Sequence, residues 1–372
     1  MKKTIVLTIL FLSFFSCENE LNILSDWKSI PVVFGIFNEK DSINYLKVNK
    51  VFLGQGDVMT FASNFDSIHY NPESISVMVH EKTWEFDNNT FTQGWITQNT
   101  HFLEPVFNIN KPEGFFHSPN QILYALNSEL NSSVKYSIEI IDNENDTILA
   151  YSDPIDIIMP SMLIQPNSFS ALNIINNSFN SKAEWITSPG SNLFELKVIF
   201  KYVEFSIFNE SDTIHKELEW KFPFFQSSNL NGNENMSYII DPSQFYSFLI
   251  SNIDVDANLR RYVYGTQAVN SGTGSVVISH SCMTFELLSA GVDLSTLILS
   301  NQNSNSFVLV KIEYSNIQNG LGIFSSRNYD IVENVKINNV TNDSISLNSI
   351  TKPLNFGYFR LNDQGEILIS YN

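Results

Sequence analysis

The sequence has few cysteines and few basic residues. Only two of its 372 residues are cysteine, at positions 17 and 282, which excludes a small fold held together by several disulfides. Lysine and arginine total 21 against 39 aspartate and glutamate, for a formal net charge of −18. Nucleic-acid binding needs basic side chains that neutralise phosphates. We therefore expect no nucleic-acid partner and an acidic surface that repels its own kind.

The sequence also lacks an apolar run long enough to span a bilayer as a helix, which takes about 18 residues. A shorter run, TIVLTILFLSFFS, follows Lys2 and Lys3 and ends at Ser16, immediately before Cys17. A basic start, a short apolar core and a small residue before the cleavage point are the three parts of a secretory signal. We therefore predict a signal peptide at residues 1–16 and a mature chain that begins at Cys17.

The stretch FFSC resembles the lipobox of bacterial lipoproteins, in which the cysteine thiol receives a diacylglyceryl group and the new amino terminus is acylated, for example with palmitate. Phe14 stands where that pattern prefers Leu, Val or Ile, and Phe15 replaces a smaller residue. The acidic CENE (residues 17–20) is similar to a signal that sends some Gram-negative lipoproteins to the cell surface. The resemblance implies a lipidated Cys17, a linker at residues 17–26 and an outer-membrane location. An uncleaved anchor and an ordinary signal peptide are the alternatives.

Most apolar stretches of the remaining chain alternate with period two, which is typical of strands with one buried face. In SISVMVH (residues 74–80) every second residue from Ile75 is apolar. The same alternation occurs in VKYSIEI (134–140), ELKVIFKYVEF (195–205) and FVLVKIEY (307–314). The sequence therefore predicts a mainly β protein.

A short polar phrase recurs between these stretches. Its copies are NEKDSI at residues 38–43, NENDTI at 143–148, NESDTI at 209–214 and NDSI at 342–345. Asn and Asp tolerate a left-handed backbone and bond their own main chain, so the phrase indicates hairpin loops. The uneven spacing argues against a solenoid or a propeller, which need a fixed period.

One segment has the period of a helix. In DPSQFYSFLISNI (residues 241–253), Asp241 is placed to cap the helix and Pro242 to begin its first turn, with apolar residues on one face. A second, brief helical turn is indicated at residues 289–297. A new strand pattern begins near Pro160. We therefore predict an antiparallel β-sandwich at residues 27–159 and a second β-rich domain, with one short inserted helix, at residues 160–372.

The candidate metal ligands do not assemble into a recognisable site. The six histidines, at 69, 80, 101, 117, 215 and 280, lack HxH or HxxxH spacing. Asp142, Glu144 and Asp146 alternate as in a calcium loop, but Thr147 stands where such a loop needs glycine, which favours a hairpin. His280 and Cys282 would share one face of a strand, and we interpret Cys282 as a buried thiol without a disulfide partner. We expect no metal and no cofactor.

The sequence contains no GxSxG, HExxH or phosphate-binding glycine motif. Carboxylate pairs for glycoside hydrolysis can lie far apart in sequence, so a hydrolase stays open. Aromatic residues in a sandwich more often form its core than stack on sugar rings. Both roles are considered for the tryptophans, which are Trp27, Trp84, Trp95, Trp185 and Trp220.

Four segments resemble, in order, parts of a family of Gram-negative outer-membrane lipoproteins that carry a domain of unknown function. They are PVVFGIFNEKDSINYLKVNKVFLG (31–54), VKYSIEIIDNENDTILAYSDPI (134–155), AEWITSPGSNLFELKVIFKY (183–202) and VKIEYSNIQNGLGIFSSR (310–327), of which YSNIQNGLGIF is the most distinctive. The resemblance implies an immunoglobulin-like first domain and a place at the outer membrane, in some members beside transporters that take up nutrients. It implies no catalytic residues.

We therefore expect a non-catalytic binding or accessory module that recognises a protein or a glycan at the cell surface, with a nutrient transporter as one candidate partner. The membrane is a partner only through the lipid on Cys17. The alternative is a surface-anchored hydrolase that acts on glycans through carboxylates that have no sequence signature.

Overall fold

The computed structural model describes residues 29–51, 60, 62–87, 92–110, 120–169, 171–175, 181–270, 276–302 and 314–371. The signal peptide, Cys17, its linker, Trp27 and most of the strand predicted at 307–314 lie outside the described residues. The chain is mainly β and sandwich-like, as the sequence predicts. Within the described ranges, no helix is long and apolar enough to cross a membrane.

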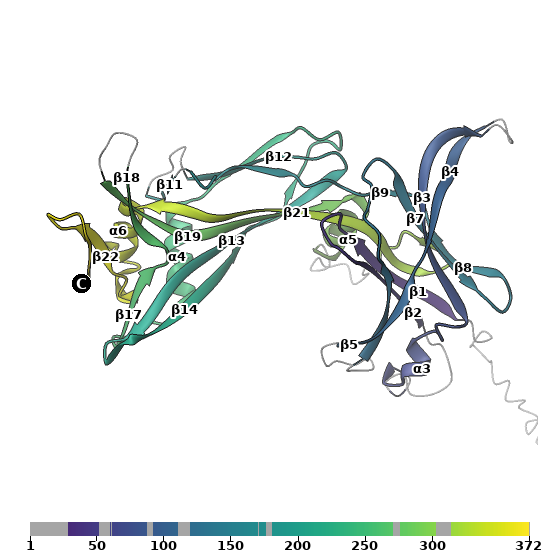
Figure 1. Ribbon diagram of the computed structural model, residues 1–372, viewed down its shortest axis with the longest axis horizontal. Coiled ribbons are helices and arrows are strands. Elements are labelled where there is room, and N and C mark those ends of the chain that lie inside the picture. Colours follow the sequence, from purple (N-terminus) through teal and green to yellow (C-terminus); the bar gives the residue numbers. More distant parts are fainter. Residues whose placement is uncertain are drawn as a thin grey trace, which may run out of the picture.

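Two sheets pack face to face in the N-terminal half (Figure 1). One side contains β1 (Ile30–Phe37), β2 (Asn44–Val51), β6 (Asn120–Leu126) and β5 (Glu104–Asn110). The other contains β20 (Ile317–Gln318), β8 (Thr147–Ser152), β7 (Lys135–Asp142), β3 (Ile75–Asp87) and β4 (Thr92–Phe102), with β9 (Ile155–Asp156) beside β7. A four-residue helix, α3 (Phe65–Ile68), precedes β3.

The core of this sandwich follows the predicted alternation. Every second side chain of β3 from Ile75 to Val79 is buried, and so are those of β7 from Tyr136 to Ile140. Val33 and Phe37 of β1 meet them from the opposite sheet. The alternation in the sequence is therefore confirmed as the pattern of the buried face.

The C-terminal half contains a strongly elongated sheet and several short strands. The long strands are β14 (Asn209–Lys221), β13 (Ser191–Ser206), β19 (Val276–Gly291) and β21 (Leu321–Asn338), in that order. Short strands beside them are β11 (Ala171–Leu172), β15 (Phe225–Gln226), β17 (Leu259–Val263) and β18 (Thr266–Asn270). Separate small sheets contain β10 (Met162–Gln165), β12 (Lys182–Ile186) and β16 (Asn235–Ile239), and β22 (Tyr358–Leu361) with β23 (Ile367–Ser370).

Helices complete this half. The predicted helix is confirmed as α4 (Pro242–Asn252), where the Asp241 side chain accepts hydrogen bonds from the main-chain N–H groups of Ser243 and Gln244. The helical turn indicated at 289–297 begins three residues later, as α5 (Val292–Gln302), because β19 continues to Gly291. The remaining helical segments are α6 (Asn339–Leu347) and a 3₁₀ turn (Lys352–Leu354).

The recurrent polar phrase does not have one structure. The copies at 38–43 and 143–148 connect hairpins, as predicted. The copy at 209–214 lies within β14, because the turn falls earlier, between Ser206 and Asn209. The copy at 342–345 is helical, so the hairpin prediction is wrong there. Asn338 caps that helix by accepting from the Thr341 N–H, which shows that the same residue types serve helix ends as well as turns.

Strand β21 runs through both halves (Figure 1). Its first residues pair in parallel with β1, and its remainder pairs antiparallel with β19. Phe324 of β21 packs edge to face on Phe37, with ring centroids 5.0 Å apart, inside the N-terminal core. Residues after 160 therefore complete the first core, while the domain division at 160 stays a prediction.

The distinctive segment YSNIQNGLGIF forms the turn that starts β21. Asn319 adopts a left-handed backbone at φ 58°, and Gly322 has φ 115°. A Cβ atom on Gly322 would collide with the carbonyl of Val33, so only glycine allows β21 to approach β1 here. Asn316 holds Phe324 from both sides, since its side chain donates to the Phe324 carbonyl and accepts from the Phe324 N–H.

Candidate functional site

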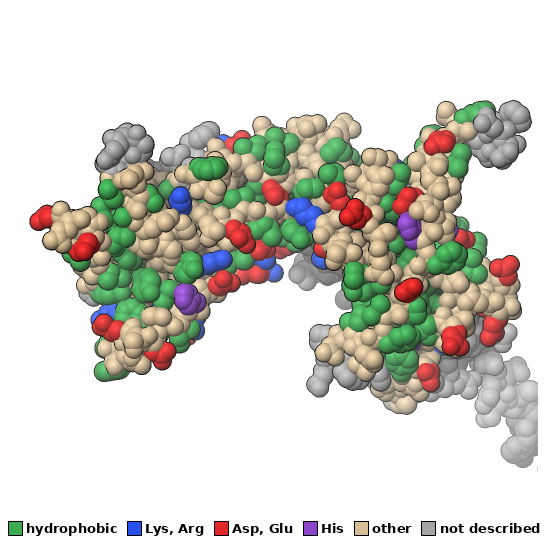
Figure 2. All heavy atoms as spheres, viewed as in Figure 1, with side chains coloured by type: hydrophobic (Ala, Val, Ile, Leu, Met, Phe, Trp, Pro, Cys, Tyr) green, Lys and Arg blue, Asp and Glu red, His purple; other side chains and the backbone are tan. Residues whose placement is uncertain are grey.

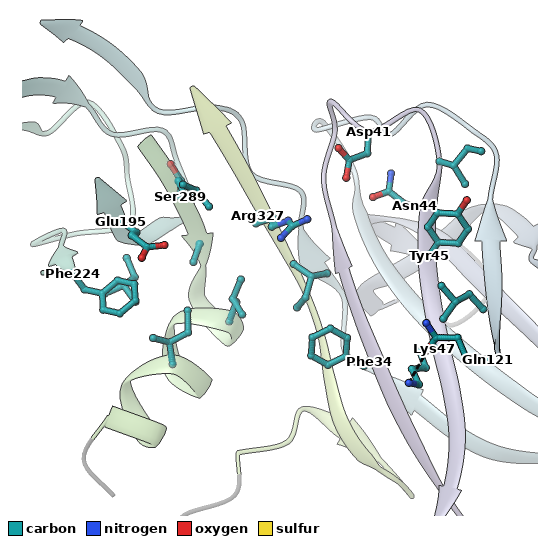
Figure 3. A pocket seen from close by; sticks show the side chains of 18 residues that line it. Phe34, Asp41, Asn44, Tyr45, Lys47, Gln121, Glu195, Phe224, Ser289 and Arg327 are labelled. Atoms are coloured by element: carbon teal, nitrogen blue, oxygen red, sulfur yellow. Dashed lines mark hydrogen bonds between the residues drawn. The ribbon is translucent and has the colours of Figure 1, made fainter. Parts of the chain in front are cut away.

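A cavity of about 680 Å³ lies where the two halves meet. One wall is the outer surface of β1, β2 and β6, and the other consists of β13, β19, α5 and Phe224 (Figure 3). On the side drawn in Figure 2, the molecule is hollowed between its halves. The cavity is a candidate site because its walls come from segments that are distant in sequence and because it has the size of a typical ligand pocket.

The N-terminal wall follows from the alternation of β1 and β2. Val33 and Phe37 point into the sandwich core, so Phe34 and Ile36 point outward into the cavity. Phe34 is 52% exposed although it is a large apolar side chain. Tyr45 of β2 also lines this wall (Figure 3). Exposed aromatic side chains inside a concavity are typical of binding sites, since they gain most from being covered.

The opposite wall is mainly aliphatic. Leu193 of β13 and Leu288 of β19 form its floor, and Leu294 and Ile298 of α5 extend it. The start of α5 is fixed on β21, because the Leu294 main-chain N–H donates to the Ser325 hydroxyl at 3.1 Å. The helix therefore holds its leucine and isoleucine side chains against the sheet and keeps the wall in place.

Four charged residues stand around this apolar surface. Asp41 accepts from the Asn38 amide at 3.2 Å, and Lys47 donates to the Gln121 side chain at 2.9 Å. Arg327 lies between Asp41 and Glu195 in Figure 3. Among the described residues, the side chains of Arg327 and Glu195 form no hydrogen bond and no ion pair. These two groups are available to a ligand that presents a carboxylate or a donor.

The tryptophans divide between core and surface. Trp185 is fully buried against Phe194, and Trp220 stacks on Phe248 of α4. Trp84 and Trp95 are 55% and 40% exposed and pack edge to face on the β3–β4 hairpin. The core role is therefore confirmed for two tryptophans, and two others are accessible to a partner.

His280 and Cys282 are both buried, as predicted, but His280 bonds elsewhere. Its Nδ1 lies 2.9 Å from the Thr266 hydroxyl, and its Nε2 lies 3.3 Å from the Asn339 side-chain oxygen. Burial lowers the pKa of His280 to about 4, so the ring is neutral at neutral pH. Burial also raises the pKa of the Cys282 thiol, which makes it unreactive.

Acidic residues in and beside the 143–148 phrase hold a turn. Asp142 accepts from the Glu144 N–H and from the Asn145 amide, each at 2.9 Å, and Asp146 has a left-handed backbone. These bonds lower the pKa of Asp142, with the Asn145 side chain as the largest cause. Across the described chain, no group of three or more His, Cys, Asp or Glu residues could hold a metal ion.

The sequence analysis missed the residues of the cavity. Phe34 and Ile36 lie in the apolar stretch that precedes the polar phrase at 38–43, and such a stretch shows at most that a strand has two faces. The available signal was that both faces of β1 are apolar, which indicates contact on each side. Arg327 follows the recognised YSNIQNGLGIF segment, yet nothing in the sequence shows that it meets a wall built from β13 and α5.

A scan against models of known protein families found no match for this chain. A search of curated proteins found no match either.

Proposed function

We propose that this chain is a non-catalytic binding module, anchored to the outer membrane by the lipid on Cys17, and that the cavity between its halves is the ligand site. The observation that supports this most is the wall composition. Phe34 is exposed inside a concave, mainly apolar surface, and the unpaired Arg327 and Glu195 stand at its edge. Such a site gains free energy from covering apolar area and gains orientation from its few polar groups.

The wall chemistry favours a protein segment over a glycan as the partner. Leu288, Leu294 and Ile298 offer no hydrogen bonds to the hydroxyl groups of a sugar, whose burial without partners is costly. An apolar side chain of a protein partner can pack against these walls. The main chain beside it, or a charged side chain of the partner, can bind Arg327 and Glu195. A surface loop of a nutrient transporter is one source of such a segment. A glycan on Phe34 and Tyr45 is the second candidate.

A lipid tether supports weak binding at this site. Holding the module at the membrane raises its local concentration near a membrane partner, so modest contacts suffice. The location is inferred from the FFSC segment and from the family resemblance of YSNIQNGLGIF. Intact mass spectrometry of the membrane-extracted chain tests it. A chain that begins at Cys17 and carries acyl groups is expected, and a chain that retains residues 1–16 would contradict the anchor.

A dye-displacement titration tests the cavity. The probe is 8-anilino-1-naphthalenesulfonate, whose apolar rings and sulfonate suit the walls and Arg327. Phe34→Ala and Arg327→Ala should each weaken its binding by roughly fivefold, whereas Phe208→Ala, which removes an exposed ring from the distant β13–β14 turn, should not. Displacement by an apolar capped peptide rather than by a neutral oligosaccharide would support a protein partner. Equal dye binding by all variants would contradict the site.

A hydrolase is the second proposal, because two carboxylates, Asp41 and Glu195, line opposite sides of the same cavity (Figure 3). Glycoside hydrolysis uses such a pair as acid and base or nucleophile. Turnover of a glycosidase substrate panel that is lost in both Asp41→Asn and Glu195→Gln would establish this function. A lack of turnover together with dye and peptide binding would favour the binding module.

A further inference from the structure

Strand β4 is an edge strand with an open side. It ends the sheet ordered β20-β8-β7-β3-β4, and among the described strands it pairs only with β3. Strand β7, which pairs with the other side of β3, ends its pairing at Lys82 and Lys135. The β3–β4 hairpin therefore continues beyond the sandwich as two strands (Figure 1). Alternate residues of such an edge direct their N–H and C=O groups away from the sheet. The Leu103 N–H donates to the Val77 carbonyl, which places Phe102 and Thr100 among the outward residues.

The edge has only one of the usual protections against strand pairing, which is a bulge. Lysine, charged residues and proline normally block an exposed edge, but TQGWITQNTHF, the sequence of β4, contains no charged residue and no proline. The other long edge, β14, carries Glu210, Asp212, Lys216, Glu217, Glu219 and Lys221. The edge strand β5 contains Pro105 and a break in register. Only a bulge interrupts β4, since Gln98 is the extra residue between the pairs of Glu81 with Asn99 and of Lys82 with Thr97.

The bulge leaves a regular segment, residues 92–97, that is long enough for a short added strand. Exposed aromatic side chains flank it on one face. Trp95 stands in that segment opposite Trp84 of β3, and Phe102, 70% exposed, lies on the same face beyond the bulge. Aromatic side chains beside a free edge provide contacts for alternate side chains of an added strand, which is how β-strand addition obtains specificity.

We propose that β4 is a docking edge onto which an extended, uncharged or basic segment of a partner protein adds as a further strand. Its main chain bonds to the outward groups of β4, and its alternate side chains pack on Trp95 and Phe102. A second copy of this chain is disfavoured because each copy carries a net charge of −18, so two copies repel. This surface lies outside the cavity and acts independently of it.

The test uses the purified full chain and two capped octapeptides of alternating threonine and valine. One peptide is unmodified, and the other is N-methylated at alternate amides, which removes donors but keeps the side chains. The unmodified peptide should bind and slow hydrogen exchange in residues 92–102, and the methylated peptide should bind at least roughly tenfold more weakly. Equal binding of the two peptides, or no binding of either, would overturn the proposal.

Two lysine variants locate the contact. A side chain at Gly94 meets no atom within 4 Å, so Gly94→Lys adds a charge to the edge without disturbing the fold. It should weaken peptide binding at least roughly tenfold. The matched control Ile214→Lys, at an exposed position of β14, should leave binding unchanged. Analytical ultracentrifugation adds the remaining outcome, because a wild-type dimer that Gly94→Lys dissociates would make a second copy the occupant and overturn the proposal.

Discussion

The two halves of the molecule build their cores differently. The N-terminal core is mainly aliphatic and lies between two sheets whose strands alternate regularly. The C-terminal core is rich in aromatic rings, and it encloses polar groups such as Arg261 and His280 that are almost fully buried. An aliphatic sandwich needs only the correct pattern of apolar residues, whereas buried polar groups need specific partners. The apolar pattern of the first core can be predicted from the sequence, whereas the partners of the buried polar groups in the second core cannot.

Arg261 illustrates the second kind. It is 1% exposed, and its guanidinium donates to the Glu204 carboxylate and to the main-chain carbonyls of Leu354 and Asp254. It thus joins β17, β13 and the C-terminal 3₁₀ turn. Substitutions of Arg261 and of other core residues test how much stability each core loses when one side chain is changed.

The largest effect is expected for Phe324→Ala. This change leaves a cavity in the N-terminal core at the point where β21 enters it, and it should lower the free energy of unfolding by about 3–5 kcal/mol. Urea denaturation measures it. Leu321→Ala, at an exposed position of the same strand, is the control and should cost much less. A small effect of Phe324→Ala would mean that β21 is not part of the first core.

Arg261→Met should destabilise the chain by about 3 kcal/mol, because the half-buried carboxylate of Glu204 loses its hydrogen-bonded partner and keeps only the more distant Lys216 ammonium, at 3.9 Å. The double variant Arg261→Met with Glu204→Gln removes that charge and should recover part of the loss. Denaturant midpoints of the three proteins decide the matter. If the double variant is no more stable than Arg261→Met, the charge of Glu204 is not the cause.

His280 predicts a loss of stability in acid. Its folded pKa of about 4 is below the ordinary value near 6.5, so the folded state disfavours the proton that the unfolded state accepts. The free energy of unfolding is therefore not reduced by His280 above pH 6.5. It falls by up to about 3 kcal/mol as the pH drops from 6.5 to about 4. The hydrogen bond with the Asn339 side chain, and after it the Asp343 carboxylate, act against this lowering of the pKa. Stability against pH should slope less in His280→Gln, and an unchanged slope would contradict the assignment.

Cys282→Ser gives the smallest expected effect, a loss of about 1–3 kcal/mol from placing a hydroxyl group in an apolar site. Cys282→Ala keeps the site apolar and serves as the comparison. The native thiol should also resist a thiol reagent until the protein unfolds, because it is fully buried. Rapid labelling under native conditions would show that this core opens more readily than its packing implies.

The sequence predicted local structure better than long-range pairing. The strands at β3, β7 and β13 and the helix α4 follow from side-chain period and capping, which are local properties. The polar phrase at 342–345 was misassigned because it lies inside α6, where the buried Asn342 side chain donates to the Gly357 carbonyl, a tertiary contact that the local pattern does not show. The parallel pairing of β21 with β1 joins residues almost 300 positions apart, and no pattern within either strand indicates it.

The cavity depends on that long-range pairing, which is why it was not predicted from the sequence. Phe34 lies in an apolar stretch before a predicted hairpin loop, but the wall facing it comes from β13, β19 and α5. Arg327 enters the cavity because β21 passes from one half into the other. A site of this kind follows from the fold, so its residues carry no motif of their own.

Hydrogen–deuterium exchange of the full chain, with and without an apolar capped peptide that displaces the dye, tests the ligand site most directly. Binding in the cavity should protect peptides from both walls, around residues 34–47 of one half and 288–298 of the other, in the wild type but not in Phe34→Ala. Protection confined to one half, or protection that persists in Phe34→Ala, would contradict a ligand site at the junction.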